Sequence, residues 1–116
     1  MEITEIGQQL VALLRTQDFI KAYNELFSDD AESIDPLDTQ SQTTKGLQKL
    51  IEKEKYFLSK ADILAVEVSE ALYARDYFSV RLRMDFKIND TDMCVDEICV
   101  YRVNQGKIIS QQFFVS

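Results

Sequence analysis

Apolar and polar residues alternate most regularly in the last third of the chain. Between Tyr77 and Ile88 every second residue is apolar, and serine, arginine, aspartate and lysine separate them. Successive side chains of a strand point to opposite faces, so this alternation predicts a long, half-buried antiparallel strand. Two more β-forming runs follow, Met93–Val103 and Lys107–Val115, and the Asn-Gln-Gly sequence between them suits a short hairpin that ends on a positive φ. The chain therefore ends in a meander of long strands that needs a cover on one face.

The first part of the chain has helical periodicity instead. Apolar residues recur at three- and four-residue steps from about Thr4 to Arg15, and again from Phe19 to Phe27, which predicts two amphipathic helices. Thr16 or Asp18 can cap the second helix, and the short join predicts a helical hairpin. Gly7 either weakens the first helix slightly or lets another element approach it closely.

The middle of the chain consists of shorter elements. We expect a strand from about Ala31 to Asp35, stopped by Pro36, and then a polar loop from Leu37 to Thr43. Thr44 can cap a third helix, and a strand is expected from about Asp62 to Tyr73. The apolar stripe of the third helix is made of Leu47, Leu50, Ile51, Phe57 and Leu58. A curved sheet wrapped around helices in this order makes a cone with an internal pocket.

Composition and charge narrow the function classes. The chain has 116 residues, enough for one domain over residues 1–116, and carries a formal net charge of −7 with no histidine. Nucleic acids are unexpected partners because their phosphates need clustered lysine and arginine, and an anionic membrane surface is disfavoured for the same reason. Any acid–base chemistry has to come from carboxylates, tyrosine, lysine or cysteine.

The two cysteines, Cys94 and Cys99, predict neither a disulfide nor a metal site. Their odd spacing within one predicted strand puts them on opposite faces about 16 Å apart, and the spacing fits no zinc motif. We expect two buried free thiols, no metal and no cofactor. No basic segment precedes Glu2 and Glu5, and no apolar run reaches the length of a membrane span. We therefore expect a cytoplasmic protein without a signal peptide.

Short motifs spread over nearly the whole chain carry a family resemblance. They are Ser33-Ile34-Asp35-Pro36, Thr44-Lys45-Gly46-Leu47, Phe78-Ser79-Val80-Arg81, Met84-Asp85, Asp96-Glu97, Val100-Tyr101-Arg102-Val103, Gly106-Lys107-Ile108-Ile109 and Gln111-Gln112-Phe113-Phe114. In this order they are similar to the SnoaL-like branch of the nuclear-transport-factor-2-like superfamily. The resemblance implies an α+β cone of the cystatin-like kind, with three N-terminal helices packed in a strongly curved, mostly antiparallel sheet. It also implies an internal pocket and, often, a homodimer formed through the outer sheet face.

The resemblance leaves the activity open, because this fold hosts isomerases, epoxide hydrolases, polyketide cyclases, dehydratases and non-catalytic binding modules. In catalytic relatives an acid or base, frequently aspartate or histidine, lies on the last strands. By that register the inward positions here are Ile109, Gln111 and Phe113, none of which titrates. Arg83-Met84-Asp85 resembles the Arg-x-Asp of epoxide hydrolases on this fold, but the acid they need on the last strand is Phe113 here. Both departures count against the cyclase and epoxide hydrolase mechanisms.

Asp35, Tyr23 and Glu97 are the candidate catalytic residues. Asp35 would serve as a base if an apolar cleft raised its pKa, whereas Asp-Pro can also simply start a turn. The hydroxyl of Tyr23, on the inner stripe of the second helix, either donates a hydrogen bond to a developing oxyanion, as in steroid isomerases of this superfamily, or is satisfied within the core. Glu97 is a second candidate hydrogen-bond donor.

Glu97 could also pair with Asp85 on the adjacent strand. Two carboxylates that share a site push one pKa upward, which creates an acid–base pair. Arg81 and Arg83 share the face of Asp85, however, so a salt-bridge ladder on the outer surface is the simpler interpretation.

Glu54 is the least expected residue of the third helix. A carboxylate in the middle of an apolar stripe is unfavourable unless it is paired or reaches a wet cavity. Either Glu54 lines the pocket, or the helix is rotated and Lys53 or Lys55 shields it at the rim. The other expected ligand-binding residues are Phe57, Tyr101, Gln111 and Phe113.

Three functional hypotheses follow from these residues. The first is a small-molecule-binding protein whose pocket holds a compact, largely apolar ligand. The second is a cofactor-independent isomerase, cyclase or dehydratase with Asp35 as the base and Tyr23 or Glu97 as the hydrogen-bond donor. The third is a protein-interaction module that works through the outer sheet face, for which a homodimer is the expected assembly.

Overall fold

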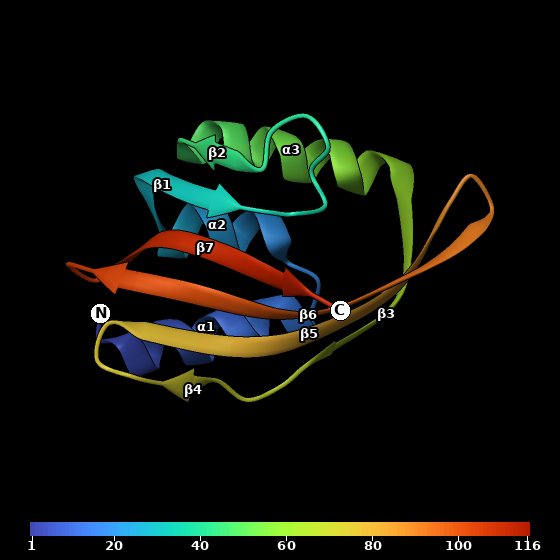
Figure 1. Ribbon diagram of the computed structural model, residues 1–116. Helices are drawn as coiled ribbons and strands as arrows, with labels where there is room; N and C mark the ends of the chain where they lie inside the picture. Colours follow the sequence, from blue (N-terminus) through green and yellow to red (C-terminus); the bar gives the residue numbers. More distant parts are fainter.

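Three helices lie against one face of a single curved sheet in the computed structural model, which describes residues 1–116 (Figure 1). The helices are α1 (Ile3–Arg15), α2 (Phe19–Leu26) and α3 (Leu47–Lys60). The strands are β1 (Phe27–Ile34), β2 (Thr43–Lys45), β3 (Ala61–Val68), β4 (Leu72–Tyr73), β5 (Tyr77–Ile88), β6 (Thr91–Asn104) and β7 (Lys107–Val115). The expected α+β cone is confirmed. None of the helices combines the length and the apolar character that crossing a lipid bilayer requires.

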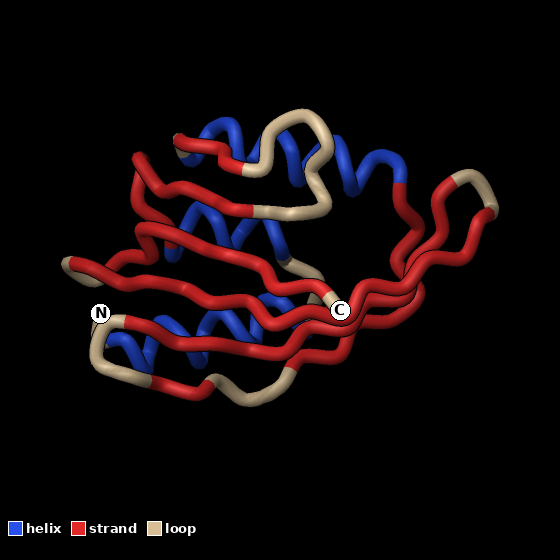
Figure 2. The backbone as a smooth tube through the Cα atoms, in the orientation of Figure 1, coloured by secondary structure: helices blue, strands red, loops and turns tan.

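The strand order of the sheet is β2-β1-β7-β6-β5-β3, and β4 pairs with β5. β1 and β7 are parallel, and all other neighbours are antiparallel. Two-residue turns join the long strands: Asn89 and Asp90 have φ of 51° and 63°, and Gln105 and Gly106 have φ of 51° and 76°. Such left-handed pairs match the twist of neighbouring strands, so both hairpins are tight. The β5–β6 hairpin extends past the layer of helices (Figure 2).

The alternation of β5 decides which face of the sheet is buried. Its residues Phe78, Val80 and Leu82 are at most 6% exposed, whereas Arg81 between them is exposed on the outer face. The predicted helical stripes supply the opposite wall, and Ile6 of α1 is fully buried there. The two walls form one core of 21 buried residues. Removing this apolar surface from water, at roughly 25 cal/mol per Å², is what holds the helices in the cone.

Element boundaries in the first half differ from the sequence prediction. β1 begins at Phe27 rather than Ala31, because Phe27 pairs with Ile108 of β7 while Glu32 pairs with Ser110. The residues between Phe27 and Glu32 therefore form a bulge within β1. Residues Thr43–Lys45 form β2 against β1, so Gly46, with a φ of 101°, takes the N-cap position of α3 that was predicted for Thr44.

The strand predicted from Asp62 to Tyr73 is two strands, β3 and β4. Val68 pairs with Leu82 and Leu72 pairs with Ser79, so the segment between them holds one residue more than the facing part of β5. The extra length bends the chain away from the ladder at Ser69, whose Oγ accepts a hydrogen bond from the Arg81 amide at 2.8 Å.

Two predictions about side-chain direction are wrong. Ile109 does not face inward, because a bulge opposite Arg102 and Val103 leaves it without a partner, and Ile108 takes the fully buried position instead. Cys94 is exposed, since it pairs with the outward Asp85, and only Cys99 is buried. The two thiols do lie on opposite faces, as predicted.

Gly7 of α1 lies against the side chain of Tyr73 in β4. A Cβ at Gly7 would lie 2.5 Å from the Tyr73 hydroxyl oxygen and 2.6 Å from its ring. The same hydroxyl donates a hydrogen bond to the Thr4 carbonyl oxygen at 3.1 Å. The structure thus supports the second of the two interpretations of Gly7, that it lets another element approach the helix closely.

The substitution Gly7→Ala should therefore destabilise the protein, although alanine is the better helix former. We expect a loss of about 1–3 kcal/mol in the free energy of unfolding, because the added methyl group displaces the Tyr73 ring. Urea unfolding at neutral pH measures this loss. Gln8→Ala, on the exposed side of the same helix, is the control and should change stability by less than about 0.5 kcal/mol. An unchanged or increased stability of Gly7→Ala would contradict this packing.

Candidate functional site

A cavity of about 100 Å³ lies between the helices and the inner face of the sheet, and we call it the inner cavity. Its wall comes from α1, α2, α3 and the strands β1, β5, β6 and β7. The lining residues are Leu10, Leu14, Phe19, Ala22, Tyr23, Phe27, Glu54, Leu82, Met84, Glu97, Cys99, Tyr101, Gln111 and Phe113. Eleven of these fourteen are hydrophobic, so any polar group in the cavity faces little competing water.

A hydrogen-bonded group of three side chains lies at one wall of the inner cavity. The amide nitrogen Nε2 of Gln111 donates to the Tyr23 hydroxyl oxygen at 2.8 Å and to the Ser33 Oγ at 3.1 Å. Gln111 is only 4% exposed, so these bonds hold its amide in one orientation. Burial raises the pKa of Tyr23 above its ordinary value, and the phenol keeps its proton. That proton has no acceptor among the side-chain hydrogen bonds of the protein and is free for a ligand.

Two carboxylates, Glu54 of α3 and Glu97 of β6, reach the same cavity. Burial, and next the negative charge of Asp35, raise the pKa of Glu54 to about 7 and the pKa of Glu97 to about 7. The Cys99 thiol donates a 3.6 Å hydrogen bond to Oε1 of Glu97. Neither glutamate takes part in any of the five salt bridges of the protein. The cavity therefore holds two carboxyl groups that exchange protons near neutral pH.

Aromatic rings make up much of the remaining wall. The rings of Tyr23 and Phe27 are 4.7 Å apart between centroids, and Phe27 meets Tyr101 edge to face at 6.3 Å. Tyr101 is 3% exposed, and burial raises the pKa of its hydroxyl well above the ordinary value. This hydroxyl lies within hydrogen-bonding reach of the Cys99 thiol, so it is a second hydroxyl in the cavity wall.

The structure brings six of the eight predicted site residues to the inner cavity: Tyr23, Glu54, Glu97, Tyr101, Gln111 and Phe113. Of the two readings of Glu54, the structure supports the one in which it lines the pocket; Lys53 is engaged elsewhere, with Asp38 and the Thr44 hydroxyl. Phe57 is not part of the lining and packs edge to face on Phe86 at 5.2 Å.

Asp35 also lies outside the cavity lining. Its Oδ1 accepts a hydrogen bond from the Leu37 amide at 2.9 Å, and its own amide donates to the Gln42 carbonyl oxygen at 2.7 Å. These hydrogen bonds are typical of an aspartate that starts a turn before proline. They support the interpretation of Asp35 as a turn residue and not as a base in a cleft. Asp35 nevertheless influences the cavity, because its charge helps to raise the pKa of both glutamates.

Asp85 and Glu97 do not share a face, contrary to one of the two sequence interpretations. Glu97 pairs with the inward Leu82, whereas Asp85 pairs with Cys94 on the outer face. The offset between the two carboxylates along the β5–β6 ladder is odd, so the pleat separates them. Asp85 instead forms a 3.3 Å ion pair with Arg83, in agreement with the salt-bridge ladder.

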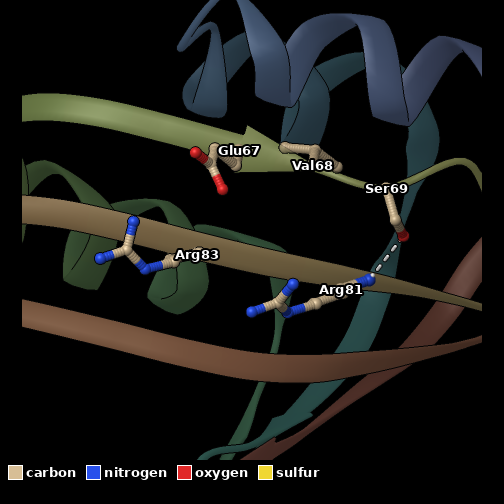
Figure 3. A pocket seen from close by; sticks show the side chains of 5 residues that line it. All are labelled: Glu67, Val68, Ser69, Arg81 and Arg83. Atoms are coloured by element: carbon tan, nitrogen blue, oxygen red, sulfur yellow. Dashed lines mark hydrogen bonds between the residues drawn. The ribbon is translucent and has the colours of Figure 1, made fainter.

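A second hollow, of about 210 Å³, lies on the outer face of the sheet and is lined by Glu67, Val68, Ser69, Arg81 and Arg83 (Figure 3). Arg81 is held by Asp96 through two hydrogen bonds of 2.9 Å and 2.7 Å. Arg83 is paired with Asp85, so neither guanidinium is free for an anion. The charges that line this outer hollow are exposed and already paired. The inner cavity is therefore the better candidate for a functional site.

Sequence reasoning missed Ser33 and Cys99 as parts of the site. In the sequence, Ser33 stands out only as part of the Ser33-Ile34-Asp35-Pro36 motif. Its contact with Gln111 depends on the parallel pairing of β1 with β7. Cys99 was expected to be a buried thiol with no further role, yet it contacts Glu97 in the cavity wall. The alternation of β6 could have placed Glu97, Cys99 and Tyr101 on one face, since they are two residues apart.

Comparison with known proteins gives a family and a fold. Residues 1–115 match a family model described as SnoaL-like domain. No curated protein is significantly similar to the chain. A candidate SnoaL-like polyketide cyclase from Mesorhizobium loti has a TM-score of 0.92 and 23% identity, covering 98% of this chain and 99% of that one.

Two further solved structures have the same fold. A protein of unknown function with a cystatin-like fold from Xanthomonas campestris has a TM-score of 0.82 and 16% identity, over 100% of this chain and 92% of that one. A hypothetical protein with a ketosteroid isomerase-like fold from Catenulispora acidiphila, in complex with trimethylamine, has a TM-score of 0.76 and 18% identity. The likeness extends over 100% of this chain and 88% of that one. At these identities the likeness shows the shared fold alone.

The raised pKa of Glu54 predicts a pH-dependent stability. Between its ordinary pKa of 4.5 and about 7 the folded protein holds a proton that the unfolded chain has lost. Stability should therefore fall as the pH rises through this window and level off above it. Glu54→Gln removes this penalty, so the variant should be more stable than the wild type by about 1–3 kcal/mol at pH 8 and by less toward pH 5.

Urea unfolding at several pH values between 5 and 8.5 measures this effect. Glu52→Gln, an exposed position of the same helix, is the matched control and should leave the pH dependence of stability unchanged. If Glu54→Gln changed stability equally at every pH, the carboxyl group of Glu54 would not titrate in the cavity as described.

Proposed function

The chain belongs to the SnoaL-like domain family, and we propose that it binds a compact, largely apolar small molecule in the inner cavity. The observation that carries this proposal is the composition of the cavity wall, in which eleven hydrophobic residues surround Glu54, Glu97 and Gln111. Apolar walls with a few convergent polar groups are typical of small-molecule sites. The candidate cyclase of similar fold from Mesorhizobium loti supports a ligand-binding role for this architecture.

The volume of the cavity limits the size of the ligand. An engineered apolar cavity of about 150 Å³ binds benzene, so a cavity of about 100 Å³ suits a ligand of about four to six non-hydrogen atoms. The Catenulispora acidiphila protein of similar fold is in complex with trimethylamine, a molecule of this size. Larger ligands would require the cavity to open at its wall.

The polar groups of the wall have distinct roles in this proposal. Tyr23 donates a hydrogen bond to the ligand, because Gln111 already donates to its oxygen and leaves its proton free. Tyr101 of β6 provides a second hydroxyl in the cavity wall. Glu97 and Glu54 meet the polar end of the ligand in either protonation state, and Phe113 closes the apolar side.

A second candidate function is proton transfer without a cofactor, as in an isomerase or a cyclase. It is favoured by the two carboxyl groups whose pKa is about 7, since a general base works best when its pKa lies near the operating pH. In this reaction Glu97 takes the proton from the carbon next to a carbonyl group, and Tyr23 donates a hydrogen bond to the oxyanion that forms. Asp35 acts here through its charge, which favours the protonated form of the glutamates.

Titration with cyclopentanone, followed by amide chemical shifts in NMR, tests the binding function. The probe should shift the amide signals of residues that line the inner cavity. Tyr23→Phe should weaken binding about three- to tenfold, because one neutral hydrogen bond to the carbonyl is lost. Tyr77→Phe, the same substitution at an exposed position of the outer face, should bind as the wild type does. Shifts confined to the outer face would contradict a ligand site in the inner cavity.

The same titration in D₂O separates the two functions. An enzyme would exchange the protons next to the carbonyl group of cyclopentanone for deuterium, and Glu97→Gln would abolish the exchange. A binding protein would shift the cavity signals without exchange above the buffer rate.

We further propose that the outer sheet face joins two copies of the chain. Ile98 and Phe114 are direct partners across the β6–β7 ladder and are 44% and 52% exposed. Adjacent exposed apolar side chains on a sheet are unfavourable in water and mark an interface. Arg81 and Asp96 flank them as a polar rim.

Phe114→Ser should then raise the dissociation constant of the dimer at least about tenfold, since large apolar side chains at an interface centre dominate its affinity. Sedimentation velocity over a concentration series measures this change. Leu37→Ser removes a similarly exposed apolar side chain from a loop and should leave the dimer intact. A wild type that stays monomeric at all concentrations would exclude this interface.

A further inference from the structure

We propose that the inner cavity selects a compact organic cation carrying one positive charge, such as a quaternary or tertiary ammonium group, over a neutral molecule of the same shape. This inference rests on the proposed ligand-binding function and adds the charge of the ligand and its dependence on pH. Four observations support it: carboxylates without a salt bridge, an aromatic wall, hydroxyl groups in that wall, and a volume too small for a hydrated ion.

The carboxylates of the cavity have no cation beside them. No lysine or arginine is among the fourteen lining residues, and all five salt bridges of the protein are made by other acidic side chains. The negative charge of Asp35 adds to that of Glu54 and Glu97. An ionised carboxylate in an apolar site is unfavourable unless it is paired. A bound cation would supply the missing partner.

The aromatic wall provides the second attraction. The rings of Tyr23, Phe27 and Tyr101 lie at centroid distances of 4.7 Å (tilted) and 6.3 Å (edge to face), and Phe19 and Phe113 complete the wall. A cation above aromatic faces is attracted by their negative π-clouds, most strongly where water is excluded. Aromatic rings and carboxylates in one cavity suit an ammonium group with alkyl substituents, since its alkyl surface contacts the rings and its charge faces the oxygens.

The hydroxyl of Tyr101 is a further polar group of the wall. Its side chain is 3% exposed and lines the cavity, and the Cys99 thiol lies within hydrogen-bonding reach of the hydroxyl. The oxygen of Tyr101 can face the positive end of a ligand, as can the Tyr23 oxygen when its proton turns toward a carboxylate.

An organic cation fits this cavity better than a metal ion. Calcium and magnesium ions take six or more oxygen ligands in a polar shell, whereas eleven of the fourteen lining residues are hydrophobic. No group of three histidine, cysteine, aspartate or glutamate side chains converges as a metal site. The volume of about 100 Å³ has room for a small ammonium ion but not for a metal ion with its water shell.

Protons and the cation should compete for the same two carboxylates. The titratable groups that face the cavity are Glu54 from α3, Tyr23 from α2, Glu97, Cys99 and Tyr101 from β6, and the nearby Asp35 after β1. Burial raises the pKa of the phenols and of the thiol, so these groups stay neutral. Only the glutamates, with a pKa of about 7, change charge near neutrality. Cation affinity should therefore rise with pH, while a neutral molecule of the same shape gains much less from ionised glutamates, because at most one of its hydrogen bonds is strengthened.

The test compares tetramethylammonium chloride with tert-butanol, which has the same number of non-hydrogen atoms and a similar shape but no charge. Both are titrated into the full-length wild type at constant ionic strength, and the amide shifts of the cavity residues give the dissociation constants. At pH 8 tetramethylammonium should bind roughly tenfold more tightly than tert-butanol. Between pH 8 and pH 6 its affinity should fall about five- to tenfold, and that of tert-butanol should stay within about twofold.

Charge-neutral variants locate the cation. Glu97→Gln and Glu54→Gln should each weaken tetramethylammonium binding about five- to tenfold at pH 8 and leave tert-butanol binding unchanged. Glu67→Gln, which removes a carboxylate from the outer face, is the control and should bind both probes as the wild type does. The wild-type comparison of the two probes stands without the variants, should either of them fail to fold.

Each result has a definite meaning. Equal binding of both probes in the cavity would overturn the cation inference and leave the proposed ligand-binding function intact. Tetramethylammonium binding that survives both glutamine substitutions would also overturn it, because the charge would then be held elsewhere. Absence of cavity shifts with both probes and with cyclopentanone would overturn the proposed function together with the inference.

Discussion

The register between β5 and β6 is the constraint on which the site depends. An unbroken ladder runs from Tyr77 opposite Arg102 to Ile88 opposite Thr91. It determines, for each paired residue of the two strands, on which of the two sheet faces its side chain lies. A slip of one residue would reverse the faces of one strand relative to the other. It would either place the outer arginines of β5 in the core or remove Glu97 and Tyr101 of β6 from the inner cavity. The two-residue turn at Asn89 and Asp90 fixes this register, because left-handed backbone at both positions allows only a tight hairpin.

The inner cavity shows a conflict between stability and chemistry. Leucine at position 54 would continue the apolar stripe of α3, and an apolar residue at position 97 would continue the inner face of β6. The chain instead has glutamate at both positions, and burial raises the pKa of each to about 7. Local departures from the rules of folding are typical of functional sites, where the loss of stability is offset by the rest of the core. The 21 buried residues around the cavity provide that support.

Much of the fold was predictable because β5 and the helices follow single, uninterrupted periods. The alternation from Phe78 to Ile88 and the stripe of α1 each depend on one local period, and the structure has both. The errors at Phe27 and Ile109 involve bulges, and the strand break after Val68 involves one residue more than the facing part of β5. A bulge is set by pairing with a distant strand, and no local period reveals it.

The site was predictable only in part for the same reason. Glu54 stood out because it breaks the stripe of its own helix, and that signal is local. Whether Glu97 shares a face with Asp85 depends on the pairing of two strands, and the sequence left this open. The contact of Ser33 with Gln111 depends on a parallel pairing between strands that are 78 positions apart in the chain. Chemistry that depends on such pairings follows from the assembled sheet and not from any single segment.

The carboxylates of the inner cavity do not lie on the last strand. The last strand presents Gln111 and Phe113 to the cavity, and neither titrates, while Glu97 lies on the neighbouring β6 and Glu54 on α3. The acidic groups therefore approach the cavity from two different elements and flank it. In the proposed complex, the two carboxyl groups would meet the charge of the ligand and the hydroxyl of Tyr23, held by Gln111, would meet its polar atoms. Occupancy of the cavity would then depend on the protonation of both glutamates, because a proton and a positively charged ligand neutralise the same oxygens.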